Sequence, residues 1–183
     1  MPVLIDEAIV TPETLLALND DDAHCELIDG HLVEKEMGFR ASRIAFVLAW
    51  FLEAYLRNGD RGIAVTEGSF DCFPIAKRTV RIPDAAIILN GRFANGEIPD
   101  GHSSIAPDIA IEVISPNETV YDSSRKVTEY LAAGVKEVWS VNPDQKTLSI
   151  RRPGLPTTEL DETGTLTSDL LPGFSLRVSE IFQ

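Results

Sequence analysis

The sequence is poor in cysteine, in long apolar runs and in positive charge, and each shortage excludes a class of protein. Cys25 and Cys72 are the only cysteines among 183 residues and lack C-x-x-C spacing, so we expect buried free thiols rather than a disulfide or a metal pair. No apolar run approaches the ~20 residues that span a bilayer, and the amino-terminal segment lacks the basic and apolar parts of an export signal. We therefore expect a cytoplasmic protein without membrane contact.

Negative charge dominates the chain. Its 16 Lys and Arg residues stand against 29 Asp and Glu residues, which gives a net charge of −13. Affinity for nucleic acid depends heavily on neutralisation of phosphates by Lys and Arg, so this balance disfavours a polyanionic partner. The acidity suits metal ions and solubility, and a local basic patch would offset it on one face.

Common catalytic signatures are also missing. The sequence contains no G-x-G-x-x-G, G-x-x-x-x-G-K-[ST], H-E-x-x-H or G-x-S-x-G motif and no zinc-type Cys/His cluster. Its three histidines are scattered, and we expect His24 and His31, which flank a predicted hairpin, to be surface residues. Trp139 and Tyr130 are expected in the core rather than as platforms for base stacking.

Length and hydrophobic pattern predict one α/β domain over residues 1–183, with a central mixed sheet flanked by helices. A short helix is predicted from Thr11 as N-cap through Leu18, a long one over 40–57, and a third from Asp122 as N-cap to about 133. The predicted strands cover a hairpin over 25–35 that turns at Asp29-Gly30, then 62–67, 68–73, 79–89, 108–114, 135–141 and 146–152. Residues 90–106 are expected to form a surface loop, and the tail over 169–182 to pack on the body.

A carboxylate inside an apolar strand is the feature that most needs explaining. Glu112 lies in "DIAIEVI", a run typical of a strand covered on both sides, where an unpaired Glu is costly. Asp108, four residues away on the same strand, is roughly 13 Å distant, whereas Asp84 on a neighbouring strand would lie about 5 Å from Glu112. Asp84 and Glu112, with a backbone carbonyl and waters, make a site for Mg²⁺ or Mn²⁺. The alternative is that Glu112 pairs with an Arg or lies at a wet edge, and that Asp84 only shapes a turn.

The Pro-Asp pair followed by a carboxylate in an apolar strand resembles the pattern of metal-dependent nucleases, which usually carry a lysine two positions after that carboxylate. Two positions after Glu112 the chain has Ile114 instead. Lys126 is a candidate replacement, because the helix that carries it must double back over the strand and bring its first turns near the strand's C-terminal end. An ammonium there would reach a scissile phosphate or the attacking water. The alternative is a solvated surface lysine.

Six segments, in order along the chain, resemble the putative restriction endonuclease family of the PD-(D/E)XK nuclease superfamily. They are "ELIDG" (26–30), "RIPDAAII" (81–88), "PDIAIEVISP" (107–116), the spacing Asp122, Lys126, Tyr130, "GVKEVWSVNP" (134–143) and "LPGFSLRVSEIF" (171–182). The resemblance implies a restriction-endonuclease-like core and an active site of Asp84, Glu112 and Lys126, with Glu26 assisting the metal or the water. The family commonly carries a histidine near the start of the long helix, where this chain has Ala41, and Arg40 or Arg43 is the alternative phosphate contact.

Three functions follow from these observations. The first is a Mg²⁺- or Mn²⁺-dependent nuclease that hydrolyses phosphodiester bonds, with DNA as the expected nucleic acid and a homodimer if both strands are cut. The second is an interaction module that kept the fold without cutting, which the net charge and the missing histidine favour. The third is hydrolysis of a small phosphorylated molecule, for which overall acidity is less of an obstacle.

Overall fold

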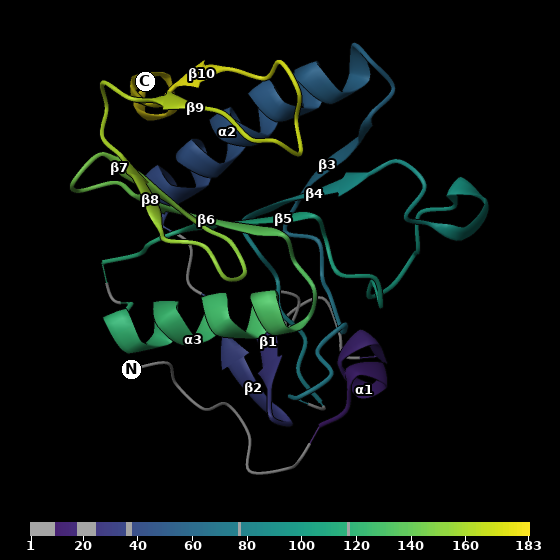
Figure 1. Ribbon diagram of the computed structural model, residues 1–183. Helices are drawn as coiled ribbons and strands as arrows, with labels where there is room; N and C mark the ends of the chain where they lie inside the picture. The colour runs from purple at the N-terminus through teal and green to yellow at the C-terminus, as the bar shows by residue number, and fades with distance from the viewer. Residues whose placement is uncertain (1–9, 18–24, 36–37, 77, 117) are drawn as a thin grey trace.

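The chain forms a mixed central sheet with helices on both faces (Figure 1). The computed structural model describes residues 10–17, 25–35, 38–76, 78–116 and 118–183, so the predicted positions Leu18 and His24 lie outside it. The helices are α1 (Pro12–Ala17), α2 (Phe39–Arg57) and α3 (Val120–Ala132), with 3-10 turns η2 (Ala94–Gly96) and η3 (Val178–Phe182). The strands are β1 (Cys25–Ile28), β2 (His31–Glu34), β3 (Gly62–Thr66), β4 (Ala85–Leu89), β5 (Ile109–Val113), β6 (Glu137–Asn142), β7 (Thr147–Arg151), β8 (Thr158–Leu160), β9 (Thr165–Leu166) and β10 (Leu176–Arg177). The predicted α/β class is confirmed.

The central sheet has the strand order β3-β4-β5-β6-β7-β8. Its β5–β6 pair is parallel and its other pairs are antiparallel. Parallel neighbours need a crossover connection, and α3 supplies it between the end of β5 and the start of β6. This crossover returns α3 over the sheet, as the sequence predicted. Separate two-stranded sheets pair β1 with β2 and β9 with β10.

An apolar core lies on each face of the sheet. Figure 1 shows α2 and the C-terminal segment on one face, and α3 with the β1–β2 hairpin and α1 on the other. Alternate residues of β4 and β5 divide between these cores: Ala85, Ile87, Ile109 and Ile111 pack with α2, whereas Ala86, Ile88 and Ala110 pack in the core of α3. Both strands therefore read as continuous apolar runs, and a residue of even number in either strand faces α3.

The long helix α2 begins one residue before its predicted start and ends at its predicted residue, Arg57. Its inner face buries a stripe of apolar side chains: Ala41, Ile44, Ala45, Val47, Leu48, Ala49, Leu52 and Leu56. Its outer face leaves Phe39, Phe46 and Trp50 exposed. No helix within the described ranges is both long and apolar enough to cross a membrane.

The start of α3 differs from the prediction. The N-cap is Thr119, whose Oγ1 accepts a hydrogen bond from the Asp122 amide at 3.1 Å, and Asp122 lies in the first turn instead of capping it. Both residue types cap well, and a carboxylate in the first turn is favoured by the helix dipole, so the sequence offered two good starts. Lys126 consequently lies in the second turn.

Two predicted strands are wrong in extent. In the segment 68–73 only Phe70 makes isolated bridges, one of them to Arg81. The segment 79–89 is a strand only over β4, because Pro83 has no amide hydrogen to donate and Val80 pairs instead with Leu27 of the hairpin. The short strands β8, β9 and β10 were not predicted. The loop over 90–106 and the packing of the tail on α2 agree with expectation.

Several single-residue predictions can be compared directly with the structure. Trp139 and Tyr130 are buried, as expected. Cys25 is buried, Cys72 is half-buried, and the two form no disulfide. His31, the first residue of β2, is half-buried.

Candidate active site

Asp84, the residue before β4, lies opposite Glu112 of β5 when the register of the two strands is continued by one pair. Ala85 pairs with Ile111 in the antiparallel β4–β5 ladder, so the next pair in that register is Asp84 with Glu112. Both residues have even numbers, and even-numbered residues of β4 and β5 face α3. Asp84 is 4% exposed and Glu112 is 5% exposed. The Val113 amide donates to Asp84 Oδ2 at 2.6 Å, which fixes this carboxylate against the end of β5.

Helix α3 brings two donors to Glu112. Lys126 and Tyr130 lie four residues apart and therefore on the same side of the helix. Lys126 Nζ is 3.0 Å from Glu112 Oε2, and the Tyr130 hydroxyl donates to Glu112 Oε1 at 2.7 Å. Lys126 Nζ also lies 3.3 Å from Glu118 Oε1, in the connection before α3. The lysine is thus a partner of the buried carboxylate rather than a solvated surface residue.

A second lysine contacts the other carboxylate. Lys35, the residue after β2, places Nζ 2.8 Å from Asp84 Oδ1, and its side chain is 11% exposed. The hairpin that carries Lys35 is held in place by a backbone bridge between Leu27 and Val80. Sequence reasoning missed Lys35, because a lysine at the end of a hairpin strand usually reaches solvent and no local pattern distinguishes this one.

Glu26 belongs to a neighbouring buried ion pair. Its Oε2 is 2.7 Å from Arg81 Nη1, and its Oε1 accepts from the Ile82 amide at 2.9 Å. Arg81 also bonds Glu129 of α3, with Nη2 2.6 Å from Glu129 Oε2, and its side chain is 1% exposed. Glu26 therefore links the hairpin to α3 through Arg81. Arg81 lies two positions before Pro83-Asp84. Arg81 was also missed, although a charged residue inside an apolar run is the signal that singled out Glu112.

The pKa values of Glu112 and Lys126 are both raised above their usual values. Burial raises the pKa of Glu112; Lys126 lowers it, and the carboxylates of Asp84 and Glu26 raise it further. Burial alone would lower the pKa of Lys126, but Glu112, Glu26 and Glu118 outweigh burial and hold that pKa above its usual value. Lys126 therefore carries its proton at neutral pH, and in this arrangement it is a charged donor and not a base.

Asp84 and Glu112 carry oxygen donors of the kind that a hard divalent cation prefers. No group of three or more His, Cys, Asp or Glu side chains in the described part of the chain is arranged to hold a metal. Mg²⁺ however needs only one or two carboxylates and completes its shell with water, and Asp84 and Glu112 supply two at facing positions. Ser140, which pairs with Glu112 in the β5–β6 register, has a buried Oγ with no hydrogen-bond partner among the described residues. Such an atom is available for a contact with water or a ligand.

Asp108, the other Pro-Asp carboxylate, lies at the opposite end of β5. It is fully buried and accepts from the Leu89 amide at 2.9 Å. Arg92 Nη1 and Lys136 Nζ lie 3.1 and 2.7 Å from its Oδ1. Asp108 therefore contacts residues at the last position of β4 and just before β6, away from Glu112. Its distance from Glu112 along β5 agrees with the expected spacing.

The two arginines near the start of α2 have other partners. Arg40 Nη1 lies 2.8 Å from Asp144 Oδ1, and its Nη2 bonds the Pro143 carbonyl. Arg43 lies over the ring of Phe46, 5.9 Å from its centroid. Pro143 and Asp144 directly follow β6, so the start of α2 lies at the same edge of the sheet as Glu112.

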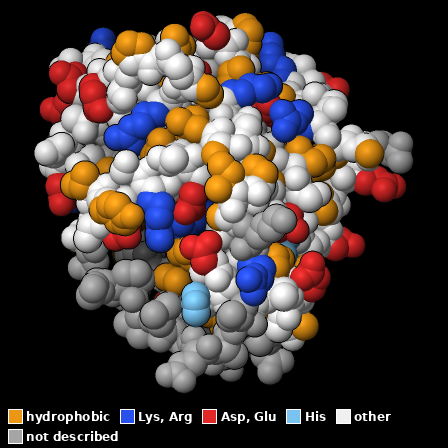
Figure 2. Space-filling view, turned by 60° about the horizontal axis from the view of Figure 1, so that its bottom comes forward, with side chains coloured by type: hydrophobic (Ala, Val, Ile, Leu, Met, Phe, Trp, Pro, Cys, Tyr) orange, Lys and Arg blue, Asp and Glu red, His pale blue; other side chains and the backbone are white. Residues whose placement is uncertain are grey.

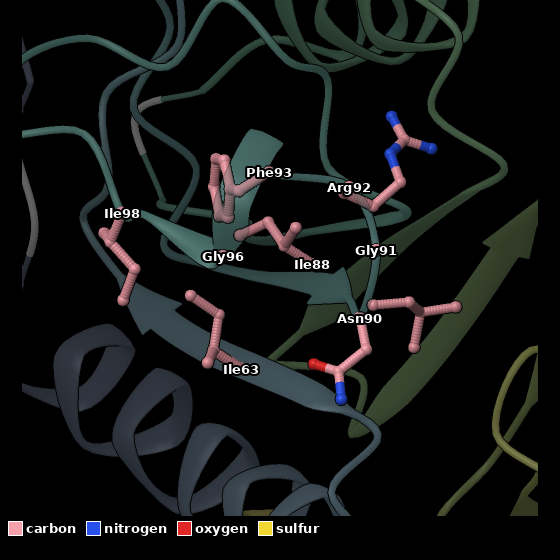
Figure 3. A pocket seen from close by; sticks show the side chains of 9 residues that line it. Ile63, Ile88, Asn90, Gly91, Arg92, Phe93, Gly96 and Ile98 are labelled. Carbon is pink, nitrogen blue, oxygen red and sulfur yellow. The ribbon is translucent and has the colours of Figure 1, made fainter.

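The surroundings of the cluster carry both signs of charge. Figure 2 shows Lys and Arg side chains mingled with Asp and Glu on the side that carries α3, α1 and the hairpin. A separate pocket lies at the far end of β4, lined by residues that include Ile63, Ile88, Phe93 and Ile98 (Figure 3). Because Asp84 precedes β4 and this pocket adjoins its last residues, the pocket is not part of the cluster.

Comparison with known proteins identifies similar chains. The model of the family described as "Putative restriction endonuclease" (Uma2) matches residues 12–179. A solved structure, described as a putative nuclease belonging to DUF820 from Anabaena variabilis ATCC 29413, superposes with a TM-score of 0.80 at 22% identity, covering 94% of this chain and 97% of that one. At that identity the likeness establishes the fold. No curated protein matches the chain.

Proposed function

Because the chain belongs to the Uma2 family of putative restriction endonucleases, we propose that it is a Mg²⁺- or Mn²⁺-dependent nuclease that hydrolyses phosphodiester bonds of DNA. One observation carries the proposal: Asp84 continues the β4–β5 register opposite Glu112, and the Lys126 ammonium lies 3.0 Å from Glu112. The description of the similar solved structure as a "putative nuclease" supports the same activity.

The residues divide into a cation-binding pair and its supports. Asp84 and Glu112 would hold the ion, which when bound lowers the pKa of a water and neutralises charge on the phosphate. Tyr130 fixes Glu112 through its hydroxyl, and the Val113 amide fixes Asp84. Such held carboxylates need no reorganisation at the moment of reaction.

Lys126 is proposed to stabilise negative charge. In hydrolysis the oxygen of water bonds to phosphorus and the bond to the leaving oxygen breaks, while charge gathers on the phosphoryl oxygens. The attacking water gives its proton to solvent, and the leaving oxygen takes a proton from solvent. An ammonium that stays protonated donates hydrogen bonds to those oxygens or orients the attacking water. Glu26 acts indirectly on the site. It fixes Arg81, and Arg81 fixes the position of α3 through Glu129. With one such site in each chain, we propose a homodimer for cutting of both strands.

A non-cutting interaction module is the second candidate, and one observation favours it. All four oxygens of Asp84 and Glu112 already have a nitrogen or hydroxyl partner: Val113 and Lys35 for the first, Tyr130 and Lys126 for the second. A site whose charges are satisfied internally is stable without an ion. The two candidates therefore differ in whether a cation displaces these partners.

Cutting assays separate the two candidates. Plasmid, single-stranded DNA and RNA are incubated with the protein and Mn²⁺, and the Asp84→Ala/Glu112→Ala variant is tested beside wild type. The matched control is Asp144→Ala/Glu162→Ala, which removes two exposed carboxylates that pair with Arg40 and Lys146. We expect wild type and control to cut and the first variant not to cut. Absence of cutting by wild type under all metal conditions would support the interaction module instead.

A further inference from the structure

Lys35 contacts the one oxygen of Asp84 that a side chain or an ion can reach. Asp84 Oδ2 is held by the Val113 amide at 2.6 Å, a backbone contact that cannot leave without moving the end of β5. Asp84 Oδ1 is left, and Lys35 Nζ lies 2.8 Å from it. A cation that binds Asp84 must therefore compete with this ammonium.

The Lys35 ammonium differs from that of an ordinary structural lysine. Its Nζ is buried and has no hydrogen-bond partner among the described residues, so its contact with Asp84 is an ion pair alone. Lys136 offers the comparison: its Nζ lies 2.7 Å from Asp108 Oδ1, but its side chain is 48% exposed. Asp108 moreover has no facing carboxylate in the β4–β5 register, whereas Asp84 faces Glu112.

The ion pair between Lys35 and Asp84 reduces an electrostatic repulsion. Two buried carboxylates at facing strand positions repel each other, and an ammonium beside one of them offsets that repulsion. A dication bound by the same carboxylates offsets it more strongly and repels the ammonium. The two cations are therefore alternatives at Asp84 Oδ1.

We propose that Lys35 is a positioning residue that occupies Asp84 in the metal-free protein and leaves Oδ1 when Mg²⁺ or Mn²⁺ binds. This inference rests on the proposed metal site at Asp84 and Glu112. Its consequence is a linkage: the ion pair stabilises the metal-free fold and by the same amount weakens the binding of metal.

Calorimetric titration with MnCl₂ tests the linkage without any measurement of cutting. Lys35→Met removes the competitor and keeps most of the side-chain volume, so we expect Mn²⁺ to bind about tenfold more tightly, or ~1.4 kcal/mol. Lys35→Arg keeps the charge and should bind Mn²⁺ as wild type does. Lys136→Met is the matched control, because it breaks a similar Lys–Asp pair away from Glu112, and it should leave Mn²⁺ affinity unchanged.

Thermal unfolding adds a second readout for the same variants. In EDTA we expect a lower midpoint for Lys35→Met than for wild type, and in excess Mn²⁺ a larger rise. If Lys35→Met does not fold, Lys35→Gln replaces it in both measurements. In an Asp84→Asn background, Lys35→Met should no longer change Mn²⁺ affinity.

The outcomes distinguish this inference from the proposed function. Mn²⁺ binding that depends on Asp84 but is unchanged or weaker in Lys35→Met overturns the inference alone. Mn²⁺ binding that is equal in wild type, Asp84→Asn and Glu112→Gln overturns the proposed metal site and the inference with it.

Discussion

Lys126 Nζ lies 3.0 Å from Glu112 Oε2, although Lys126 belongs to α3 and Glu112 to β5. The position two residues after Glu112 holds Ile114, whose amide pairs with the Val141 carbonyl and continues the ladder. The ammonium thus reaches the carboxylate from the layer that covers the sheet. The parallel β5–β6 pair requires this layer, because α3 is its crossover.

Removal of the Lys126 ammonium tests its proposed role directly. We expect Lys126→Met to lower the rate of plasmid cutting by at least about 100-fold, because a preorganised charge near the phosphate is lost. Mn²⁺ affinity, measured by calorimetry, should not fall, since Lys126 is not a ligand. Lys146→Met, which loses an exposed pair with Glu162, is the control. Cutting by Lys126→Met within tenfold of wild type would remove the residue from the mechanism.

Tyr130→Phe removes a single hydroxyl from the cluster. That hydroxyl donates to Glu112 Oε1 at 2.7 Å, and hydrogen bonds to charged groups contribute about 1.5–3 kcal/mol. We expect a loss of stability of about 2 kcal/mol in urea unfolding and a fall in cutting of about tenfold. Tyr55→Phe is the matched control: its hydroxyl donates to the Pro172 carbonyl at 2.9 Å, away from Glu112, and its loss should cost about 1 kcal/mol with no change in cutting. Equal effects of both variants on cutting would contradict a role for Tyr130 in holding Glu112.

The sequence predicted those parts of the site that follow from strand period and crossover geometry. Asp84 and Glu112 were paired because residues across a ladder lie close together while residues four apart on one strand do not, and the β4–β5 register agrees when it is continued by one residue. Lys126 was placed near them because a helix after a parallel strand must return over the sheet, even though its N-cap was assigned three residues too late.

The partners that were missed depend on packing between distant segments. Lys35 meets Asp84 only because the hairpin docks through Leu27 and Val80, a contact across 53 residues that no local pattern encodes. The predicted strand over 79–89 failed for the same reason, since Val80 pairs with the hairpin and not within the central sheet. Tyr130 was within reach of sequence reasoning, because it lies one helical turn after Lys126.

Arg81 joins the hairpin to α3, and its replacement should destabilise the whole fold. The guanidinium is buried between Glu26 and Glu129, so Arg81→Met removes the ion-pair partner of the buried Glu26, whereas the half-buried Glu129 keeps Arg125 nearby. Breaking a buried pair in this way costs about 3–5 kcal/mol. Arg57→Met is the control, because its pair with Glu53 is largely exposed and should contribute less than about 1 kcal/mol. Urea unfolding measures both, and a loss below about 1 kcal/mol for Arg81→Met would show that the buried pair is not needed for stability.

The same ion pair should make stability depend on pH in a definite direction. Burial alone would raise the pKa of Glu26, but Arg81, Lys126 and the Ile82 amide outweigh burial and hold that pKa below its ordinary value of 4.5. A carboxyl whose pKa is lowered in the folded protein contributes stability above its unfolded pKa, and that contribution is lost as the pH falls through the folded value. We therefore expect Glu26→Gln to be less stable than wild type at pH 7.

Urea unfolding at a series of pH values checks this prediction. The deficit of Glu26→Gln should stay constant from pH 7 to about 5 and shrink below 4.5, because wild-type Glu26 is then progressively protonated and resembles the amide. Glu53→Gln is a useful comparison, since the Ala64 amide and Arg57 also lower the pKa of Glu53 at a more exposed position, away from Glu112. A Glu26→Gln deficit that is unchanged down to pH 3 would mean that the carboxyl acts through shape and hydrogen bonding rather than through its charge. A deficit that grows with acid would reverse the sign of the assigned pKa shift.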